Sequence, residues 1–149
     1  MPNFLIINGP NLNLLGRRDT DIYGSTTLEE IEESLTKRAA EIGSTVVFFQ
    51  SNIEGAIIDF IQQQSPDANA IILNPGALSM YGYALKDALI DSQLPVLEIH
   101  ISNPYAREYW RRHSIITDIA KGQIAGLGWR GYLAALDTLN ALITEEDQT

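Results

Sequence analysis

The sequence predicts an α/β fold, in which a parallel β-sheet is covered by helices on both faces. Five short apolar segments recur along the chain and alternate with segments of helical character. The apolar segments are continuous rather than alternating with polar residues, which is typical of strands buried on both faces. Regular alternation of strands and helices indicates βαβ units, and these units build parallel sheets.

The predicted strands are rich in Ile, Val, Leu and Phe, and each is short enough for an ordinary strand. They span residues 4–7, 45–49, 70–73, 95–101 and 123–128. Their spacing leaves room for a helix in each interval. We therefore expect each strand to be followed by a crossover helix that returns the chain to the same end of the sheet.

The first long helix is predicted over residues 26–43. Thr26 and Thr27 are each followed three residues later by a glutamate, which is a capping-box pattern, and the segment closes on Gly43. Its apolar residues recur at helical spacing and form one stripe: Leu28, Ile31, Leu35 and Ala39. The other helical segments are predicted at residues 53–64, 82–92, 106–113 and 132–143.

The chain is the size of one domain. Its 149 residues can bury a substantial core, and a composition of 45% hydrophobic and 19% charged residues is ordinary for a globular protein. No linker, repeat or low-complexity tract divides it. We expect residues 144–149, a polar and acidic stretch, to be solvated.

Charge and composition exclude several classes of function. A net charge of −9 and a pI of about 4.5 argue against nucleic-acid and anionic-membrane partners, although a small anion needs only a local basic pocket. The absence of cysteine excludes disulfides and thiolate chemistry, and two histidines are too few for a histidine-rich metal site. No apolar stretch approaches the roughly 20 residues of a membrane span, and no signal peptide is recognisable, so we expect a cytoplasmic protein.

Polar side chains gather where the predicted strands end. They include Asn8, Asn11, Gln50, Asn52, Asn74, His100 and Ser102, with Arg107, Arg111 and Arg112 further along. Ligands of parallel α/β sheets bind beyond the carboxyl ends of the strands, so these residues predict one polar site. The alternative is that asparagine, glycine and proline simply form turns there.

The residue types at this edge limit the ligands and reactions that the site can support. Neither nucleotide-binding glycine motif is present, and no aspartate closes the third predicted strand, which disfavours phosphotransfer of the receiver type. The lysines Lys37, Lys86 and Lys121 fall inside helices or before the last strand, so imine chemistry is disfavoured. An arginine-rich, hydrogen-bonding pocket suits a small polyhydroxylated carboxylate.

Five blocks of sequence carry a resemblance to a known family. They are NGPNLNLLGRRDTDIYG, QSNIEGAIID, NPGA with the following ALKDAL, EIHISNPYAREYWRRHS and GLGWRGY. With these blocks the chain resembles the type II 3-dehydroquinate dehydratases over almost its whole length. The resemblance implies a flavodoxin-like three-layer sandwich with a five-stranded parallel sheet, and a single catalytic domain over residues 1–149.

The resemblance also implies an activity. Members of this family remove water in the trans sense from 3-dehydroquinate to give 3-dehydroshikimate, in the shikimate pathway or in quinate catabolism. No metal or organic cofactor is implied, and the family commonly assembles as a dodecamer built from trimers. We therefore expect a small anionic substrate and a homo-oligomer, with no nucleic-acid or membrane partner.

Five positions match the catalytic residues of the family. Tyr23 matches the base that removes the proton next to the ketone, and Arg18 matches an essential lid arginine that would stabilise its phenolate. Asn11 matches the residue that holds a water on the enolate oxygen. His100 matches the acid that protonates the departing hydroxyl, and Glu98 would orient it. From the residues alone, Tyr23 is better interpreted as a surface turn aromatic. His100 could be a structural histidine, but Glu98 and Ser102 on the same strand face favour a functional one.

Five further positions match substrate-binding residues. Asn74, Ile101 and Ser102 match the binders of the carboxylate and the adjacent hydroxyl, the latter two partly through main-chain N–H groups. Arg111 matches an arginine that contacts the ring hydroxyls. Arg107 also falls on a family arginine, to which the resemblance assigns no definite role.

The sequence departs from the family after the Asn-Pro-Gly-Ala block. Residues 79–82 read Ser-Met-Tyr-Gly where the family has Thr-His-Thr-Ser, so Met80 replaces a histidine that binds ring hydroxyls. The partner of that histidine, an aspartate reached across a subunit contact, is present as Asp87. Two alternatives follow: a diverged paralogue acting on a related hydroxy acid, or a non-catalytic oligomeric binding protein.

Overall fold

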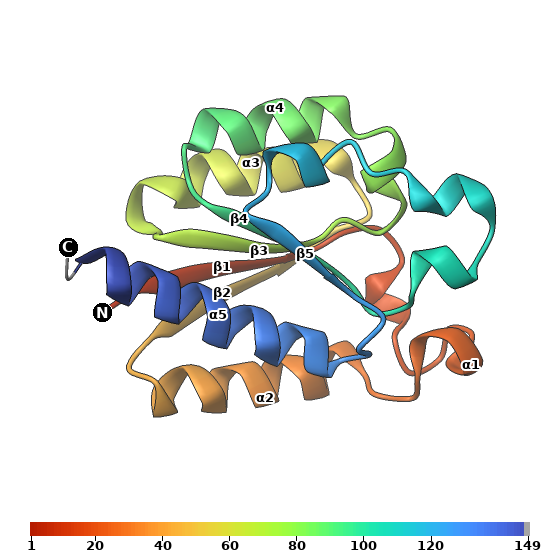
Figure 1. Ribbon diagram of the computed structural model, residues 1–149, viewed down its shortest axis with the longest axis horizontal. Coiled ribbons are helices and arrows are strands. Elements are labelled where there is room, and N and C mark those ends of the chain that lie inside the picture. Colours follow the sequence, from red (N-terminus) through yellow and green to blue (C-terminus); the bar gives the residue numbers. More distant parts are fainter. Residues whose placement is uncertain (148–149) are drawn as a thin grey trace.

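The computed structural model of the chain describes residues 1–147 and contains one five-stranded sheet (Figure 1). The strands lie in the order β2-β1-β3-β4-β5, and every neighbouring pair is parallel. Their bounds are β1 (Asn3–Asn8), β2 (Thr45–Gln50), β3 (Ala70–Asn74), β4 (Val96–His100) and β5 (Gly122–Ala125). This is the flavodoxin-like strand order, so the predicted fold class is confirmed.

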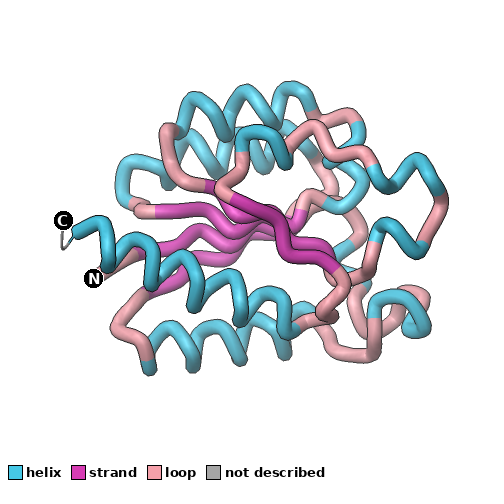
Figure 2. Tube along the Cα trace, viewed as in Figure 1, coloured by secondary structure: helices cyan, strands magenta, loops and turns pink. Residues whose placement is uncertain are grey.

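Helices cover both faces of the sheet, as Figures 1 and 2 show. The helices α2 (Leu28–Glu41) and α5 (Arg130–Asp147) pack on one face, and α3 (Glu54–Gln64) and α4 (Tyr83–Ser92) pack on the other. The single turn α1 (Thr20–Tyr23) lies beyond the carboxyl end of β1. Within residues 1–147, none of the helices combines the length and apolarity that crossing a membrane requires.

The central strand β1 shows why its sequence is continuously apolar. Phe4 and Ile6 pack in the core between the sheet and the α2–α5 layer, whereas Leu5 and Ile7 pack toward α3 and α4. All four side chains are completely buried. Successive residues of a strand point to opposite faces, so a strand covered on both sides needs an apolar residue at every position.

The start of α2 confirms the predicted capping box and identifies its residue. The side chain of Thr27, rather than that of Thr26, accepts a hydrogen bond from the Glu30 backbone N–H at 3.2 Å. The Glu30 carboxylate in turn accepts from the Thr27 backbone N–H at 3.4 Å. The predicted apolar stripe of this helix is buried against the sheet.

Most predicted elements agree with the structure to within two residues at each end, and three do not. The fifth strand ends at Ala125 rather than residue 128, because Gly126 and Gly128 adopt positive φ angles of 84° and 64° that break the strand. Residues 106–113 form no α-helix but short 3₁₀ turns, Pro104–Ala106 and Tyr109–Arg112. The last helix continues to residue 147, with residues 144–146 exposed as expected; residues 148–149 lie outside the described residues.

Candidate active site

A cavity of about 170 Å³ opens at the carboxyl edge of the sheet. It lies among the loops that follow β1, β3 and β4, with α1 on one side. Ten of the twelve residues proposed from the sequence line it: Asn11, Arg18, Tyr23, Asn74, Met80, His100, Ile101, Ser102, Arg107 and Arg111. Glu98 lies directly behind His100, and Asp87 lies elsewhere.

The strand register explains why so many amides meet here. Asn8, at the end of β1, is aligned with Gln50 on one side and with Asn74 on the other. Beyond β1, Asn11 takes a left-handed conformation with φ of 71°, and its backbone N–H donates to the Asn52 side chain at 2.9 Å. Asn8 and Asn52 therefore build the loop, while Asn11 and Asn74 line the cavity.

Two arginines surround Tyr23. The Nη1 of Arg107 donates hydrogen bonds to the Tyr23 hydroxyl at 2.7 Å and to the Ser102 hydroxyl at 3.2 Å. The guanidinium groups of Arg18 and Arg107 lie 4.2 and 5.0 Å from the centre of the tyrosine ring. Both guanidinium groups place positive charge beside the tyrosine. Arg107, rather than the expected Arg18, makes the direct hydrogen bond.

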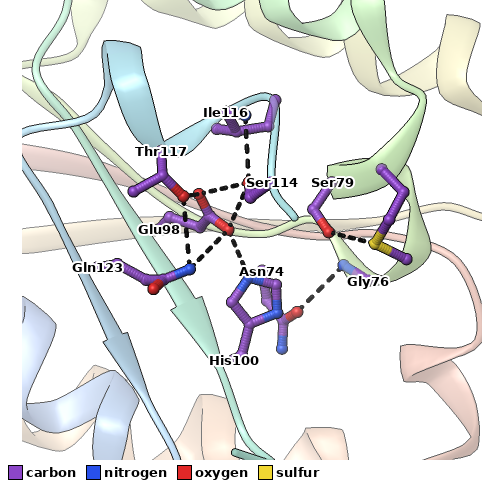
Figure 3. Close-up of polar contacts among 10 residues, drawn as sticks. Asn74, Gly76, Ser79, Glu98, His100, Ser114, Ile116, Thr117 and Gln123 are labelled. Atoms are coloured by element: carbon purple, nitrogen blue, oxygen red, sulfur yellow. Dashed lines mark hydrogen bonds and ion pairs between the residues drawn. The ribbon is translucent and has the colours of Figure 1, made fainter. Parts of the chain in front are cut away.

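His100 contacts a carboxylate that has no exposed surface. Its Nε2 lies 2.5 Å from Oε2 of Glu98 (Figure 3). Three further groups donate to this carboxylate: the hydroxyls of Ser114 at 3.0 Å and Thr117 at 2.8 Å, and the amide of Gln123 at 3.2 Å. Burial acts to raise the pKa of Glu98, but the hydrogen bond and charge of His100, with the two hydroxyls, lower it overall.

This pairing leaves one nitrogen of His100 for the cavity. Because Nε2 is held by the charged Glu98, Nδ1 is the atom that can exchange a proton with a ligand. Sequence reasoning identified Glu98 but missed the three groups that donate hydrogen bonds to it. Gln123 is aligned with Glu98 in the β4–β5 register, whereas Ser114 and Thr117 come from a loop whose position no spacing in the sequence reveals.

A buried tyrosine, also missed from the sequence, supports Asn74. The Asn74 side chain accepts from the Gly76 backbone N–H at 3.2 Å and donates to the Tyr132 hydroxyl at 3.0 Å. That hydroxyl donates in turn to Asn8 at 2.5 Å. Burial raises the pKa of Tyr132, so the phenol stays neutral. A tyrosine within an amphipathic helix is ordinarily interpreted as core, so sequence reasoning assigned it no role even though it closes the GLGWRGY block.

The remaining wall of the cavity contains Met80 and Arg111. The thioether of Met80 accepts from the Ser79 hydroxyl at 3.0 Å, so no strong hydrogen-bonding group stands at this position. Arg111 is paired with Glu108 and stacks on Trp110, with 4.2 Å between its guanidinium and the ring centre. This pairing with Arg111 lowers the pKa of Glu108.

Asp87 does not reach this cavity. It lies exposed on α4, away from the lining residues of its own chain. A role for it in binding therefore requires a neighbouring subunit, as the family resemblance implies.

The cavity is suited to an anion. Its lining contains three arginines, Arg18, Arg107 and Arg111, and no carboxylate, although the whole chain is strongly acidic. Asparagine side chains and main-chain N–H groups add neutral donors. Among residues 1–147, no three His, Asp or Glu side chains come together as metal ligands.

Comparison with known proteins agrees with this geometry. Residues 2–140 match the family model described as Dehydroquinase class II. The chain is 56% identical over 135 residues to a 3-dehydroquinate dehydratase of Roseiflexus castenholzii, covering 91% of this chain and 86% of the relative. It is 50% identical over 135 residues to a protein named Catabolic 3-dehydroquinase 1 from Neosartorya fischeri, covering 91% and 90%.

A solved structure agrees as well. The crystal structure of a type II dehydroquinase from Propionibacterium acnes superposes with a TM-score of 0.90 at 40% identity, covering 95% of this chain and 97% of that one. The similarity therefore extends through every element that builds the cavity. The chain belongs to the class II dehydroquinase family.

Proposed function

We propose that this protein is a hydro-lyase that converts 3-dehydroquinate to 3-dehydroshikimate through an enolate. One observation carries the proposal: a tyrosine bonded to an arginine and a histidine bonded to a buried carboxylate line the same cavity. This arrangement provides a base and an acid at one site, which is what removal of a proton and loss of water require.

The first step is proton abstraction. The Tyr23 phenolate, stabilised by Arg107 and Arg18, takes the proton from the carbon between the ketone and the departing hydroxyl. The electron pair of the broken C–H bond moves onto the ketone oxygen and gives an enolate. Asn11, at the cavity wall, holds a water against that oxygen.

The second step is loss of water. The enolate re-forms the ketone, and its carbon–carbon electron pair shifts to make a double bond to the carbon that bears the hydroxyl. The C–O bond at that carbon breaks, and the leaving hydroxyl takes a proton from Nδ1 of His100. Glu98 stabilises the positive charge that His100 carries before this transfer. The proton held by Tyr23 then returns to His100 through solvent, which restores both groups for the next turnover.

The cavity lining offers groups for each polar part of the substrate. Asn74 and the main-chain N–H groups of Ile101 and Ser102 bind the carboxylate and its neighbouring hydroxyl. Arg111 contacts the ring hydroxyls, and Met80 lies beside them in the lining. The roles of these residues follow the family pattern, and their placement around one cavity supports them.

The proposal also covers the oligomeric state, the cellular location and the pathway of the protein. The protein acts as one catalytic domain over residues 1–149 within a homo-oligomer, most simply a dodecamer, in which Asp87 of a neighbouring subunit faces the cavity. It needs no metal or organic cofactor and works in the cytoplasm. Among its relatives are two named as catabolic enzymes and others named only as dehydratases, so both pathways fit.

Turnover of 3-dehydroquinate tests the proposal. The enone of the product absorbs in the ultraviolet where the substrate does not, so a rising absorbance is the expected result. Because no lysine lies at the cavity, borohydride added with substrate should leave both activity and protein mass unchanged. A protein that binds the substrate without forming an enone would contradict the proposal, and so would a reduced covalent adduct.

A further inference from the structure

Tyr132 lies in the first turn of α5 and has no contact with solvent. Its hydroxyl sits between two asparagines, Asn8 at the end of β1 and Asn74 at the end of the neighbouring strand β3. Asn74 lines the active-site cavity, whereas Tyr132 does not. The tyrosine therefore acts on the site only through the asparagine that it contacts.

The directions of these hydrogen bonds are determined by the groups involved. Asn8 presents its side-chain oxygen to Tyr132, so the single hydroxyl hydrogen of Tyr132 must point to Asn8. The hydroxyl is then left with only lone pairs for Asn74, which must present its NH₂ group. The Gly76 backbone N–H imposes the same choice, because it requires the oxygen of the Asn74 side chain.

We infer that Tyr132 is a positioning residue that fixes the Asn74 amide so that an N–H, and not the oxygen, faces the substrate. One N–H of the Asn74 NH₂ group is used by Tyr132, and within residues 1–147 the second has no protein acceptor. This inference rests on the proposed function, in which the ligand presents a carboxylate at this wall. An inverted amide would present its oxygen to that carboxylate and repel it.

The test is the replacement Tyr132→Phe, which removes the hydroxyl and keeps the ring. We expect the Kd for quinate, a non-reacting cyclic hydroxycarboxylate, and the KM for 3-dehydroquinate to rise about tenfold, the loss of roughly one hydrogen bond to a charged group. We expect kcat to change less than about threefold, because Tyr132 touches neither the base nor the acid. A second variant, Asn8→Ala, frees the hydroxyl hydrogen to point at Asn74 and should weaken quinate binding in the same direction.

A double mutant measures the energetic coupling between Tyr132 and Asn74. In an Asn74→Ala background, Tyr132→Phe should cause no further loss of quinate affinity. The control is Leu139→Ala, a buried residue of the same helix outside this hydrogen-bond chain, which should lower the unfolding temperature and leave the quinate Kd unchanged. An equal effect of Leu139→Ala on quinate, or a full tenfold loss by Tyr132→Phe in the Asn74→Ala background, would overturn the inference.

Quinate binding and enone formation, measured separately, also distinguish failure of this inference from failure of the proposed function. A parent protein that binds quinate but forms no enone from 3-dehydroquinate would refute the proposed activity, while a loss of quinate affinity in Tyr132→Phe would still support the positioning role. Unchanged quinate affinity in both Tyr132→Phe and Asn8→Ala would refute the positioning role and leave the activity standing. A parent that binds no quinate would overturn the inference.

Discussion

Replacement of Glu98 by glutamine should both impair His100 as the general acid and destabilise the fold. Glu98→Gln keeps the size of the side chain but removes the charge opposite His100. The new NH₂ group must also face donors, because the carboxylate oxygens now accept from His100, Ser114, Thr117 and Gln123. One amide oxygen cannot replace two carboxylate oxygens in that network.

The expected magnitude follows from the complete burial of Glu98. Breaking a buried ion pair by changing one partner costs about 3–5 kcal/mol of unfolding free energy. For a chain of this size, each kcal/mol lowers the unfolding temperature by about 2–4 °C, which gives a fall of roughly 6–20 °C. Loss of a general acid lowers turnover by about 10²–10⁴-fold.

The assay combines thermal unfolding with enone formation. The matched control is Glu41→Gln, the same chemical change in a surface pair with Arg38, which should change the unfolding temperature far less than Glu98→Gln does and leave turnover unchanged. If Glu98→Gln kept parental turnover, His100 would not be the acid that this pair supports. An unfolding temperature equal to that of Glu41→Gln would refute the energetic reasoning.

The contact between Glu98 and His100 also predicts that the free energy of unfolding depends on pH. The folded state lowers the pKa of Glu98 below its ordinary value of 4.5, so its charge stabilises the fold above that pH and the contribution is lost as the pH falls through the lowered value. Parent and Glu98→Gln should therefore differ fully near neutral pH, and the difference should shrink as the pH falls from 4.5 through the lowered pKa of Glu98. A constant difference throughout this range would contradict the assignment.

Three further experiments test the base Tyr23, the loop that contains Arg17 and Arg18, and the part of the cavity wall where Met80 replaces the family histidine. Tyr23→Phe should lower turnover by about 10²–10⁴-fold with quinate affinity largely kept, and near-normal turnover would move the base elsewhere. Residues 17–24 should form a mobile lid that closes over an anionic ligand. Trypsin should therefore cut after Arg17 or Arg18 in the free protein, and quinate should protect against this cleavage; equal cleavage with and without quinate would refute closure. Met80→His should tighten 3-dehydroquinate binding by roughly 5- to 150-fold, and adding Asp87→Ala should remove part of that gain; a neutral Met80→His would leave Arg111 as the group that recognises the hydroxyls.

Much of the fold could be predicted because one physical constraint dominates it. A strand buried on both faces must be continuously apolar, so β1 and β3 were visible as uninterrupted runs. The extent of β5 could not be predicted in the same way, because the conformations of Gly126 and Gly128 decide where it ends. Backbone conformation at glycine depends on tertiary context, which a local pattern does not contain.

The residues of the site fall into two groups, one of which could be predicted from the sequence and one of which could not. Residues that line the cavity come from strand ends and their loops, so Asn74 and His100 could be proposed from their positions. The residues that hold them, such as Ser114 and Tyr132, come from other elements and resemble ordinary loop and core residues in sequence. Only the folded geometry shows that they fix the charge of Glu98 and the orientation of an amide.

The stereochemistry of the elimination tests the central claim most directly. Substrate carrying deuterium at one defined position between the ketone and the leaving hydroxyl can be converted completely and its product examined by ¹H NMR. The trans elimination of the family, with Tyr23 as the base and His100 as the acid, predicts loss of only the hydrogen trans to the departing group, with no covalent adduct on the protein. Loss of the hydrogen on the same side as the hydroxyl, or conversion that proceeds unchanged in Tyr23→Phe, would contradict this account.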